Sequence, residues 1–117
     1  MDPQPNCLFC RIVAKTVPAQ IVFENDRVVA FRDIRPGAPT HVLVIPRSHI
    51  AGVHEAKPED VELLGHLVFA ARGVAEQLSL ARGGYRLVVN QGADAGQSVF
   101  HLHVHVLGGR PLAWPPG

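Results

Sequence analysis

Three histidines alternate with apolar residues near the end of the chain, in the stretch His101-Leu102-His103-Val104-His105-Val106-Leu107. On an extended strand, alternate side chains share one face and lie roughly 6–7 Å apart. The pattern predicts three imidazoles side by side on an accessible strand face, with the intervening apolar residues facing the core. Imidazole titrates near neutral pH and serves as a base, a nucleophile or a metal ligand, so a row of three favours a functional site.

Two kinds of chemistry fit this row. The first is metal chemistry: imidazoles two residues apart on a strand can share a catalytic zinc, and the protein would then be a metal hydrolase centred on the row. Zinc-bound histidines are usually oriented by carboxylates, but no Asp or Glu lies between Gln97 and Gly117. A nucleophilic histidine needs only a backbone carbonyl to orient one nitrogen, which leaves the other nitrogen free to attack.

The segment before the row, Gly92 to Ser98, contains two glycines and ends in a hydroxyl group. Glycine lets the backbone approach a ligand and direct N–H groups at an oxyanion, and the serine hydroxyl can donate or accept. We interpret this loop as a phosphate cradle beside the histidines.

Periodicity and turn residues predict the elements that position these groups. A short helix is expected over 7–15 and a long helix over 58–80, where Pro58, Glu59 and Asp60 suit a first turn. Strands are expected over 20–24, 27–32, 40–45, 85–90 and 99–107. Because hairpin connections dominate, the fold class expected is α+β, with a mainly antiparallel five-stranded sheet and one long and one short helix.

Bulk composition excludes several classes. The 117 residues, 47% of them hydrophobic, are expected to form a single domain over 1–117, with a polar, flexible stretch at 1–6. The net charge is only +1, and the sequence contains no basic stripe, so no nucleic-acid partner is expected. No leader or membrane-length apolar run is evident, and the two cysteines are too few for a disulfide scaffold, so we expect a reducing, cytoplasmic location.

Residues 101–107 fit the signature His-φ-His-φ-His-φ-φ, where φ is apolar, and the chain resembles the histidine triad (HIT) superfamily. It is most similar to the branch of histidine triad nucleotide-binding proteins. The stretches that carry this resemblance are Phe31–Ile34, Ala38–His41, Leu43–Pro46, Gly96–Val99, Leu107–Arg110 and Trp114–Gly117.

The resemblance implies a purine nucleoside phosphoramidase. Such an enzyme hydrolyses a P–N bond at the α-phosphate of adenosine phosphoramidates or aminoacyl-adenylate-type compounds, and releases a nucleoside monophosphate. By motif position, His103 would attack phosphorus to form a nucleotidyl-histidine intermediate, which divides one displacement into two.

The resemblance also implies roles for the neighbouring residues. His105 would stabilise charge on the phosphate, Ser98 would contact the phosphate or the leaving amine, and His101 and His41 would hold the row in place. Asp33 would accept the ribose hydroxyls. The remaining substrate-binding residues expected are Leu8, Phe9, Ile12, Phe31, Ile34, Asn90, Gly96, Gln97, Val99 and Trp114. For the apolar members, an ordinary place in the core is the competing interpretation.

In this branch two subunits pair about a two-fold axis, and the tail of one reaches the site of the other. The resemblance therefore implies a homodimer in which the tail over 110–117, with its single tryptophan Trp114, contacts the partner. A frayed terminus is the alternative.

Cys7 and Cys10 form a C-x2-C pair, which is either half of a zinc site or simply two buried thiols. Some histidine triad relatives bind zinc through such a pair and two histidines, and here the matching positions are His49 and His101. Any zinc is expected to be structural, with no cofactor needed for the chemistry.

Two further alternatives stay open. One is a dinucleoside polyphosphate hydrolase of the same superfamily, against which the Trp-Pro-Pro-Gly ending of the chain argues by resemblance. The other is a module that binds nucleotides without turning them over, although binding alone has no need of a nucleophile.

Overall fold

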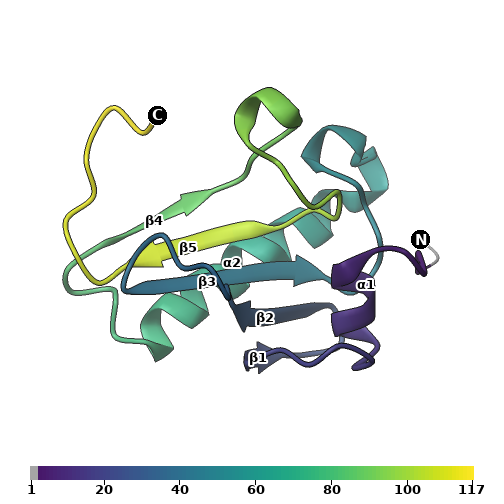
Figure 1. The fold of residues 1–117 in the computed structure, drawn as a ribbon, viewed down its shortest axis with the longest axis horizontal. Coiled ribbons are helices and arrows are strands. Elements are labelled where there is room, and N and C mark those ends of the chain that lie inside the picture. The colour runs from purple at the N-terminus through teal and green to yellow at the C-terminus, as the bar shows by residue number, and fades with distance from the viewer. Residues whose placement is uncertain (1–2) are drawn as a thin grey trace.

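The computed structural model describes residues 3–117 and shows one antiparallel sheet with a helix on each face (Figure 1). The strands are β1 (Ile21–Glu24), β2 (Val28–Arg32), β3 (Thr40–Pro46), β4 (Tyr85–Val88) and β5 (Val104–Gly108). Their order across the sheet is β1-β2-β3-β5-β4, and every neighbouring pair is antiparallel. The helices are the short α1 (Leu8–Val13) and the long α2 (Val61–Gln77). The expected α+β class with five strands is confirmed.

Alternation along β2 explains why both faces of the sheet are covered. Val28 and Ala30 belong to the larger apolar cluster, which includes Leu67 and Val74 of α2. Their neighbours Val29 and Phe31 point the other way, into a smaller cluster that includes Phe9 and Ile12 of α1. A strand buried on both sides reads as a continuous apolar run instead of an alternating one, as β2 does.

The long helix begins later than the sequence predicts. Pro58–Asp60 forms a single 3₁₀ turn, in which the Asp60 carboxylate accepts the Lys57 N–H at 2.9 Å, and the α-helix follows from Val61. It ends at Gln77, and the chain reverses at Ser79, whose φ is +62°. The predicted helix over 58–80 is therefore correct in position, with irregular first and last turns.

The last strand is shorter than predicted, and this changes the site. β5 begins at Val104, so residues 99–103 are not part of the sheet, and the prediction of a strand over 99–107 is wrong in its first half. Pairing with β3 ends at Val44 opposite Val104, and pairing with β4 ends at Val88 opposite His105, so residues 99–103 belong to neither ladder. Instead, the Leu102 N–H donates to the carbonyl of Ile50 at 2.6 Å.

The prediction that the histidine row lies on an accessible face is also wrong. His101 is 0% exposed and His103 is 7% exposed, because α1 covers the side of the sheet toward which they point. Leu102, Val104 and Val106 do face the larger core, as the alternation requires.

The other boundaries differ by one or two residues. Pro46 closes β3, β4 stops at Val88 instead of Asn90, and the glycine-bearing loop contains one 3₁₀ turn over Ala93–Ala95. Residues 1–2 of the predicted flexible N-terminal stretch lie outside the described residues, while Gln4 donates its N–H to the sulfur of Cys10 at 3.4 Å. Within residues 3–117, no helix combines the length and the apolar character needed to cross a bilayer.

Candidate active site

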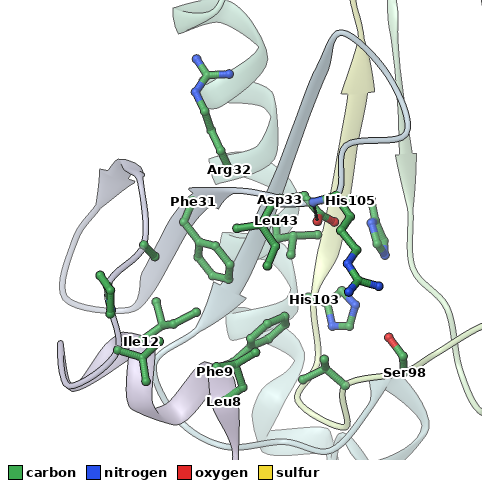
Figure 2. Close-up of a pocket in the computed structure, with 16 residues that line it drawn as sticks. Leu8, Phe9, Ile12, Phe31, Arg32, Asp33, Leu43, Ser98, His103 and His105 are labelled. Atoms are coloured by element: carbon green, nitrogen blue, oxygen red, sulfur yellow. Dashed lines mark hydrogen bonds between the residues drawn. The ribbon is translucent and has the colours of Figure 1, made fainter.

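A cavity of about 400 Å³ opens between α1, the end of β2 and the segment before β5, which is a volume suited to a small-molecule ligand (Figure 2). One part of its wall is apolar, and the other part carries polar groups that converge on the histidines. The apolar lining is Leu8, Phe9, Ile12, Val17, Pro18, Ala19, Phe31, Ile34, Leu43 and Val99. The polar and charged lining is Arg32, Asp33, Arg35, Ser98, His103 and His105.

A backbone carbonyl holds the His103 ring in one orientation. Its Nδ1 lies 2.7 Å from the carbonyl oxygen of His101, and a carbonyl only accepts, so Nδ1 carries the hydrogen. In the neutral ring, Nε2 then keeps its lone pair. The edge of the Phe9 ring packs against His103, with centroids 5.2 Å apart at 79°, and fixes the other side of the imidazole. The structure therefore presents an oriented imidazole with a free nitrogen at the cavity.

A chain of hydrogen bonds sets the tautomer of the next histidine. The Gly37 N–H donates to Nδ1 of His41 at 2.9 Å, so the hydrogen of neutral His41 must be on Nε2. That Nε2–H faces Nδ1 of His105 at 2.9 Å, which makes His105 the acceptor and leaves its own hydrogen on Nε2. Nε2 of His105 is buried and has no hydrogen-bond partner within residues 3–117.

Burial keeps these two rings neutral. Desolvation, and then the nearby His103 and His41, lower the pKa of His105 to about 4. Desolvation also lowers the pKa of His41, although the Asp33 carboxylate 3.4 Å from its Nε2 acts in the opposite direction. At neutral pH His105 is therefore an uncharged N–H donor without an acceptor. An oxyanion at the cavity would supply one.

These assignments predict a specific pattern of nitrogen resonances. In ¹⁵N spectra near pH 7, we expect the hydrogen on Nδ1 of His103 and on Nε2 of both His41 and His105. His105 should stay neutral as the pH is lowered through 6 and 5, since its pKa is about 4. A protonated Nδ1 on His105, or a charged His105 at pH 6, would contradict the hydrogen-bond chain.

The loop before the histidine row reaches the cavity only at its end. Ser98 and Val99 line the cavity, and neither the N–H nor the hydroxyl of Ser98 has a partner among residues 3–117. Gly96, with φ of +93°, closes the turn, which requires glycine. The Gln97 side chain is 5% exposed and is engaged by the Gly92 N–H and the carbonyls of Ala51 and Val99.

Several predicted site residues lie elsewhere. Asn90, Gly96, Gln97 and Trp114 do not line this cavity, and neither do His41 and His101, which lie directly behind the lining histidines. Trp114 is 79% exposed, and the Arg86 guanidinium lies 5.9 Å from its ring. The tail that carries it runs away from α1 (Figure 1). Ile34 lines the cavity but is 91% exposed.

Sequence reasoning missed part of the lining. Val17, Pro18 and Ala19 lie between the predicted helix over 7–15 and the predicted strand over 20–24, and Leu43 lies in an apolar strand with nothing to distinguish it from the core. Arg32 and Arg35 lie close to Asp33 in the sequence, and this proximity is the only sequence feature that could have indicated that they line the cavity.

A second cluster lies behind His103 and has the donor set of a zinc site. Sulfur or nitrogen atoms of Cys7, Cys10, His49 and His101 all lie within 4.8 Å of one another. Nδ1 of His101 is 3.3 Å from Sγ of Cys7 and 3.6 Å from Sγ of Cys10, and Nδ1 of His49 is 3.3 Å from Sγ of Cys10. A tetrahedral zinc with Zn–S of about 2.3 Å and Zn–N of about 2.05 Å separates its ligands by about 3.6 Å.

The surrounding hydrogen bonds also suit a metal. Nε2 of His101 lies 2.9 Å from the carbonyl of Pro46, which places the hydrogen there and leaves the Nδ1 lone pair directed at the sulfurs. Backbone N–H groups of Cys10 and Gln4 donate to the two sulfurs. Burial raises the pKa of the Cys10 thiol, so metal binding would displace protons.

The group Asp33, His41 and His105 also lies within 4.8 Å, but its hydrogen bonds do not suit a metal. The Gly37 N–H occupies the Nδ1 lone pair of His41, so its Nε2 carries hydrogen and has no lone pair for an ion. Of the two clusters, the one with the two cysteines therefore has lone pairs available for a metal ion, whereas in the one with Asp33 the His41 nitrogen that faces the cluster carries hydrogen.

Known proteins resemble this chain over nearly all of its length. It is 50% identical over 110 residues, 94% of this chain and 96% of the relative, to an uncharacterized HIT-like protein of Synechocystis. It is 45% identical over 119 residues, 100% of this chain and 91% of the relative, to a 14 kDa zinc-binding protein of Zea mays. The crystal structure of a HIT family hydrolase from Legionella pneumophila has 49% identity and a TM-score of 0.94, covering 96% of this chain and 100% of that one. The HIT domain family model matches residues 14–112, and the chain belongs to the HIT domain family.

Proposed function

We propose that this protein is a hydrolase that cleaves the P–N bond of purine nucleoside 5′-phosphoramidates through a covalent nucleotidyl-His103 intermediate. The observation that carries the proposal is the pairing of a free Nε2 on His103 with a partnerless Nε2–H on His105. Similar structures support the class: they include HIT family hydrolases and, at 30% identity and a TM-score of 0.81, a histidine triad nucleotide-binding protein from Candida albicans.

The two steps balance without a cofactor. Nε2 of His103 attacks the α-phosphorus, the P–N bond to the amine breaks, and the amine takes up a proton from solvent at the open mouth beside the Ser98 hydroxyl. Water then attacks the same phosphorus and gives up a proton to solvent, the P–Nε2 bond breaks to restore neutral His103, and the nucleoside monophosphate leaves. The proton released in this step balances the one that the amine took up in the first. The neutral Nε2–H of His105 donates to a non-bridging oxygen as charge develops on it, while the N–H of Ser98 supplies a second donor.

The remaining wall would hold the nucleoside. Leu8, Phe9, Ile12 and Phe31 form a slot of apolar side chains for the base. Oδ1 of Asp33 accepts the Arg35 N–H at 2.8 Å, which orients the carboxylate so that Oδ2 can accept a ribose hydroxyl. Apolar burial of the base and fixed polar groups for the ribose and phosphate are the usual division within such sites.

Release of AMP from an adenosine phosphoramidate tests the proposal directly. The pure protein should convert the compound to AMP and free amine in equal amounts. A dinucleoside polyphosphate hydrolase would favour a dinucleoside polyphosphate over the amidate, and a binding module would release neither product.

The proposal also includes a cytoplasmic location, because the two free thiols fit a reducing compartment.

The structural role of the second cluster is also part of the proposal. Cys7, Cys10, His49 and His101 would hold a zinc ion, which would tie α1 to the sheet. α1 carries both thiols and the base-slot residues Leu8, Phe9 and Ile12. The nucleophile is oriented by the carbonyl of His101, not by its side chain, so the ion would stabilise the fold and take no part in the reaction.

Metal binding should therefore follow the two thiols. We expect about one equivalent of Zn²⁺ in the wild type and a Co²⁺-substituted form with thiolate absorption, both lost in a Cys7→Ser, Cys10→Ser variant. Chelation should lower the midpoint of thermal unfolding and leave the initial rate of AMP release at 25 °C within about twofold. Loss of all activity on chelation, with the fold intact, would indicate a catalytic metal instead.

We also propose that two copies pair about a two-fold axis through α2. Val61, Val68 and Phe69 are 66%, 53% and 68% exposed, and with Gly65 they follow helical spacing on one face. A second copy would cover this face, and the exposed Trp114 would then be free to reach the partner's cavity. We expect the wild type to sediment as a dimer and Phe69→Lys as a monomer. A monomeric wild type at micromolar concentration would contradict the pairing.

A further inference from the structure

Two arginines line the cavity, Arg32 and Arg35, and neither guanidinium has a hydrogen-bond or ion-pair partner within residues 3–117. Arg32 is directed away from His103 (Figure 2), which leaves Arg35 as the lining cation that can act beside the histidines. The carboxylate in the lining, Asp33, accepts the Arg35 backbone N–H through Oδ1, and its Oδ2 lies 3.4 Å from Nε2 of His41.

The loop that carries Arg35 is fixed, although the side chain is exposed. Its N–H is bonded to Oδ1 of Asp33, and Pro36 restricts its backbone to extended conformations. Beyond Pro36, Gly37 donates to His41 at 2.9 Å and accepts from the Arg110 guanidinium at 3.0 Å. Arg35 therefore projects from a segment of the cavity wall whose backbone is anchored on both sides.

The geometry of displacement determines which part of a substrate lies at that mouth. Attack at phosphorus proceeds with the nucleophile and the leaving group roughly in line. His103 is 7% exposed and lies at the cavity floor, so the leaving amine must lie on the far side of the phosphorus, toward solvent. Arg35 lines the same cavity and is exposed, so it belongs to the solvent-facing part of the lining.

We propose that Arg35 is a specificity-determining residue that binds a carboxylate on the leaving amine, so that the preferred substrates are nucleoside phosphoramidates of amino acids with a free carboxylate. This inference rests on the proposed function. A guanidinium and a carboxylate match as a two-pronged hydrogen-bonded pair, which a neutral leaving group cannot form. The guanidinium of Arg35, which has no partner within residues 3–117, supplies the attraction for such a carboxylate.

A matched pair of substrates tests the assignment. One is the adenosine 5′-phosphoramidate of 3-aminopropanoate, and the other is that of 3-aminopropanamide, which has the same shape without the charge. For each enzyme the quantity measured is the ratio of the two kcat/KM values, at low and at high salt. Comparing ratios between variants removes the intrinsic difference between the two amines.

We expect the wild-type ratio to favour the carboxylate by about three- to fivefold at low salt, as for a partly exposed ion pair, and to shrink at 0.5 M salt. Arg35→Gln should reduce this preference by the same factor, and Arg35→Glu should reverse it. Arg32→Gln is the control and should keep the wild-type ratio. An Arg35→Gln ratio equal to that of the wild type would overturn the inference while leaving the phosphoramidase intact. Absence of AMP from either substrate would instead refute the proposed function itself.

Discussion

His103→Ala should lower the rate of AMP release by at least about a thousandfold while leaving nucleotide affinity within a few-fold of the wild type. The substitution removes the cavity-lining imidazole whose Nε2 keeps its lone pair, since the hydrogen of His103 is on Nδ1, held by the His101 carbonyl, whereas Nε2 of His105 carries hydrogen. The base slot and Asp33 do not depend on this ring, so binding should survive. The measurements are single-turnover kinetics with an adenosine phosphoramidate, and calorimetry with AMP.

The control for this prediction is the fold. The rings of His103 and Phe9 pack with centroids 5.2 Å apart, so the substitution removes a buried contact. The variant should therefore be checked for an unchanged circular dichroism spectrum and a cooperative thermal transition. A folded His103→Ala protein that turns over near the wild-type rate would remove His103 from the chemistry. A folded variant that no longer binds AMP would mean that the ring holds the nucleotide instead of attacking it.

The second large effect should come from a residue that does not line the cavity. His41→Ala should lower kcat by about a hundred- to a thousandfold, the typical cost of one oxyanion donor, with little change in KM. Without the His41 Nε2–H, Nδ1 of His105 loses its donor, and the ring can move its hydrogen from Nε2 to Nδ1. The cavity would then face the phosphate with a lone pair instead of an N–H.

His41→Gln provides the matched control, because an amide NH₂ can occupy the position of the imidazole Nε2–H and donate to His105. We expect it to recover a large part of the rate that His41→Ala loses, and to restore the Nε2–H resonance of His105. If His41→Ala and His41→Gln are equally impaired, or if His41→Ala keeps the Nε2–H of His105, the hydrogen-bond chain from Gly37 does not set the tautomer.

The histidine row shows how far a sequence pattern can predict a site. Alternation placed His101, His103 and His105 on one side of the chain and Leu102, Val104 and Val106 on the other, and this is confirmed. The strand itself was predicted too long, because alternation does not reveal where the neighbouring strands end. Pairing with β3 ends at Val44 opposite Val104, although β3 itself continues to Pro46, where it pairs only with β2.

Burial of the row could not be predicted locally. A strand with polar residues on one face is typical of a solvated face. Here a helix of six residues from the other end of the chain, α1, covers that face through Phe9 and Ile12. The contact joins positions more than ninety residues apart, as does the 3.3 Å approach of Cys7 to His101. The family resemblance brought Cys7, Cys10, His49 and His101 together, whereas their spacing in the sequence did not.

The hydrogen-bond chain through Gly37 was beyond the sequence for a different reason. It depends on one backbone N–H, which every residue except proline possesses, so no residue type marks it. The same is true of the His101 carbonyl that orients His103. Side-chain chemistry in this site could be predicted from residue types, but the tautomers that make it directional come from backbone positions.

His101 links the two clusters of the site. Its side chain faces the thiols of Cys7 and Cys10, and its carbonyl holds the ring of His103. One buried residue can therefore serve both the proposed zinc site and the proposed catalytic site, since the first uses the ring and the second uses the main chain.

The covalent intermediate is tested most directly by trapping it. Wild-type protein mixed with an adenosine phosphoramidate, quenched within milliseconds under denaturing conditions and digested, should yield one peptide carrying an acid-labile AMP group on His103. His103→Gly should yield none under the same conditions. A wild-type enzyme that releases AMP with no adduct at any quench time, or an adduct that persists in His103→Gly, would contradict nucleophilic attack by this histidine.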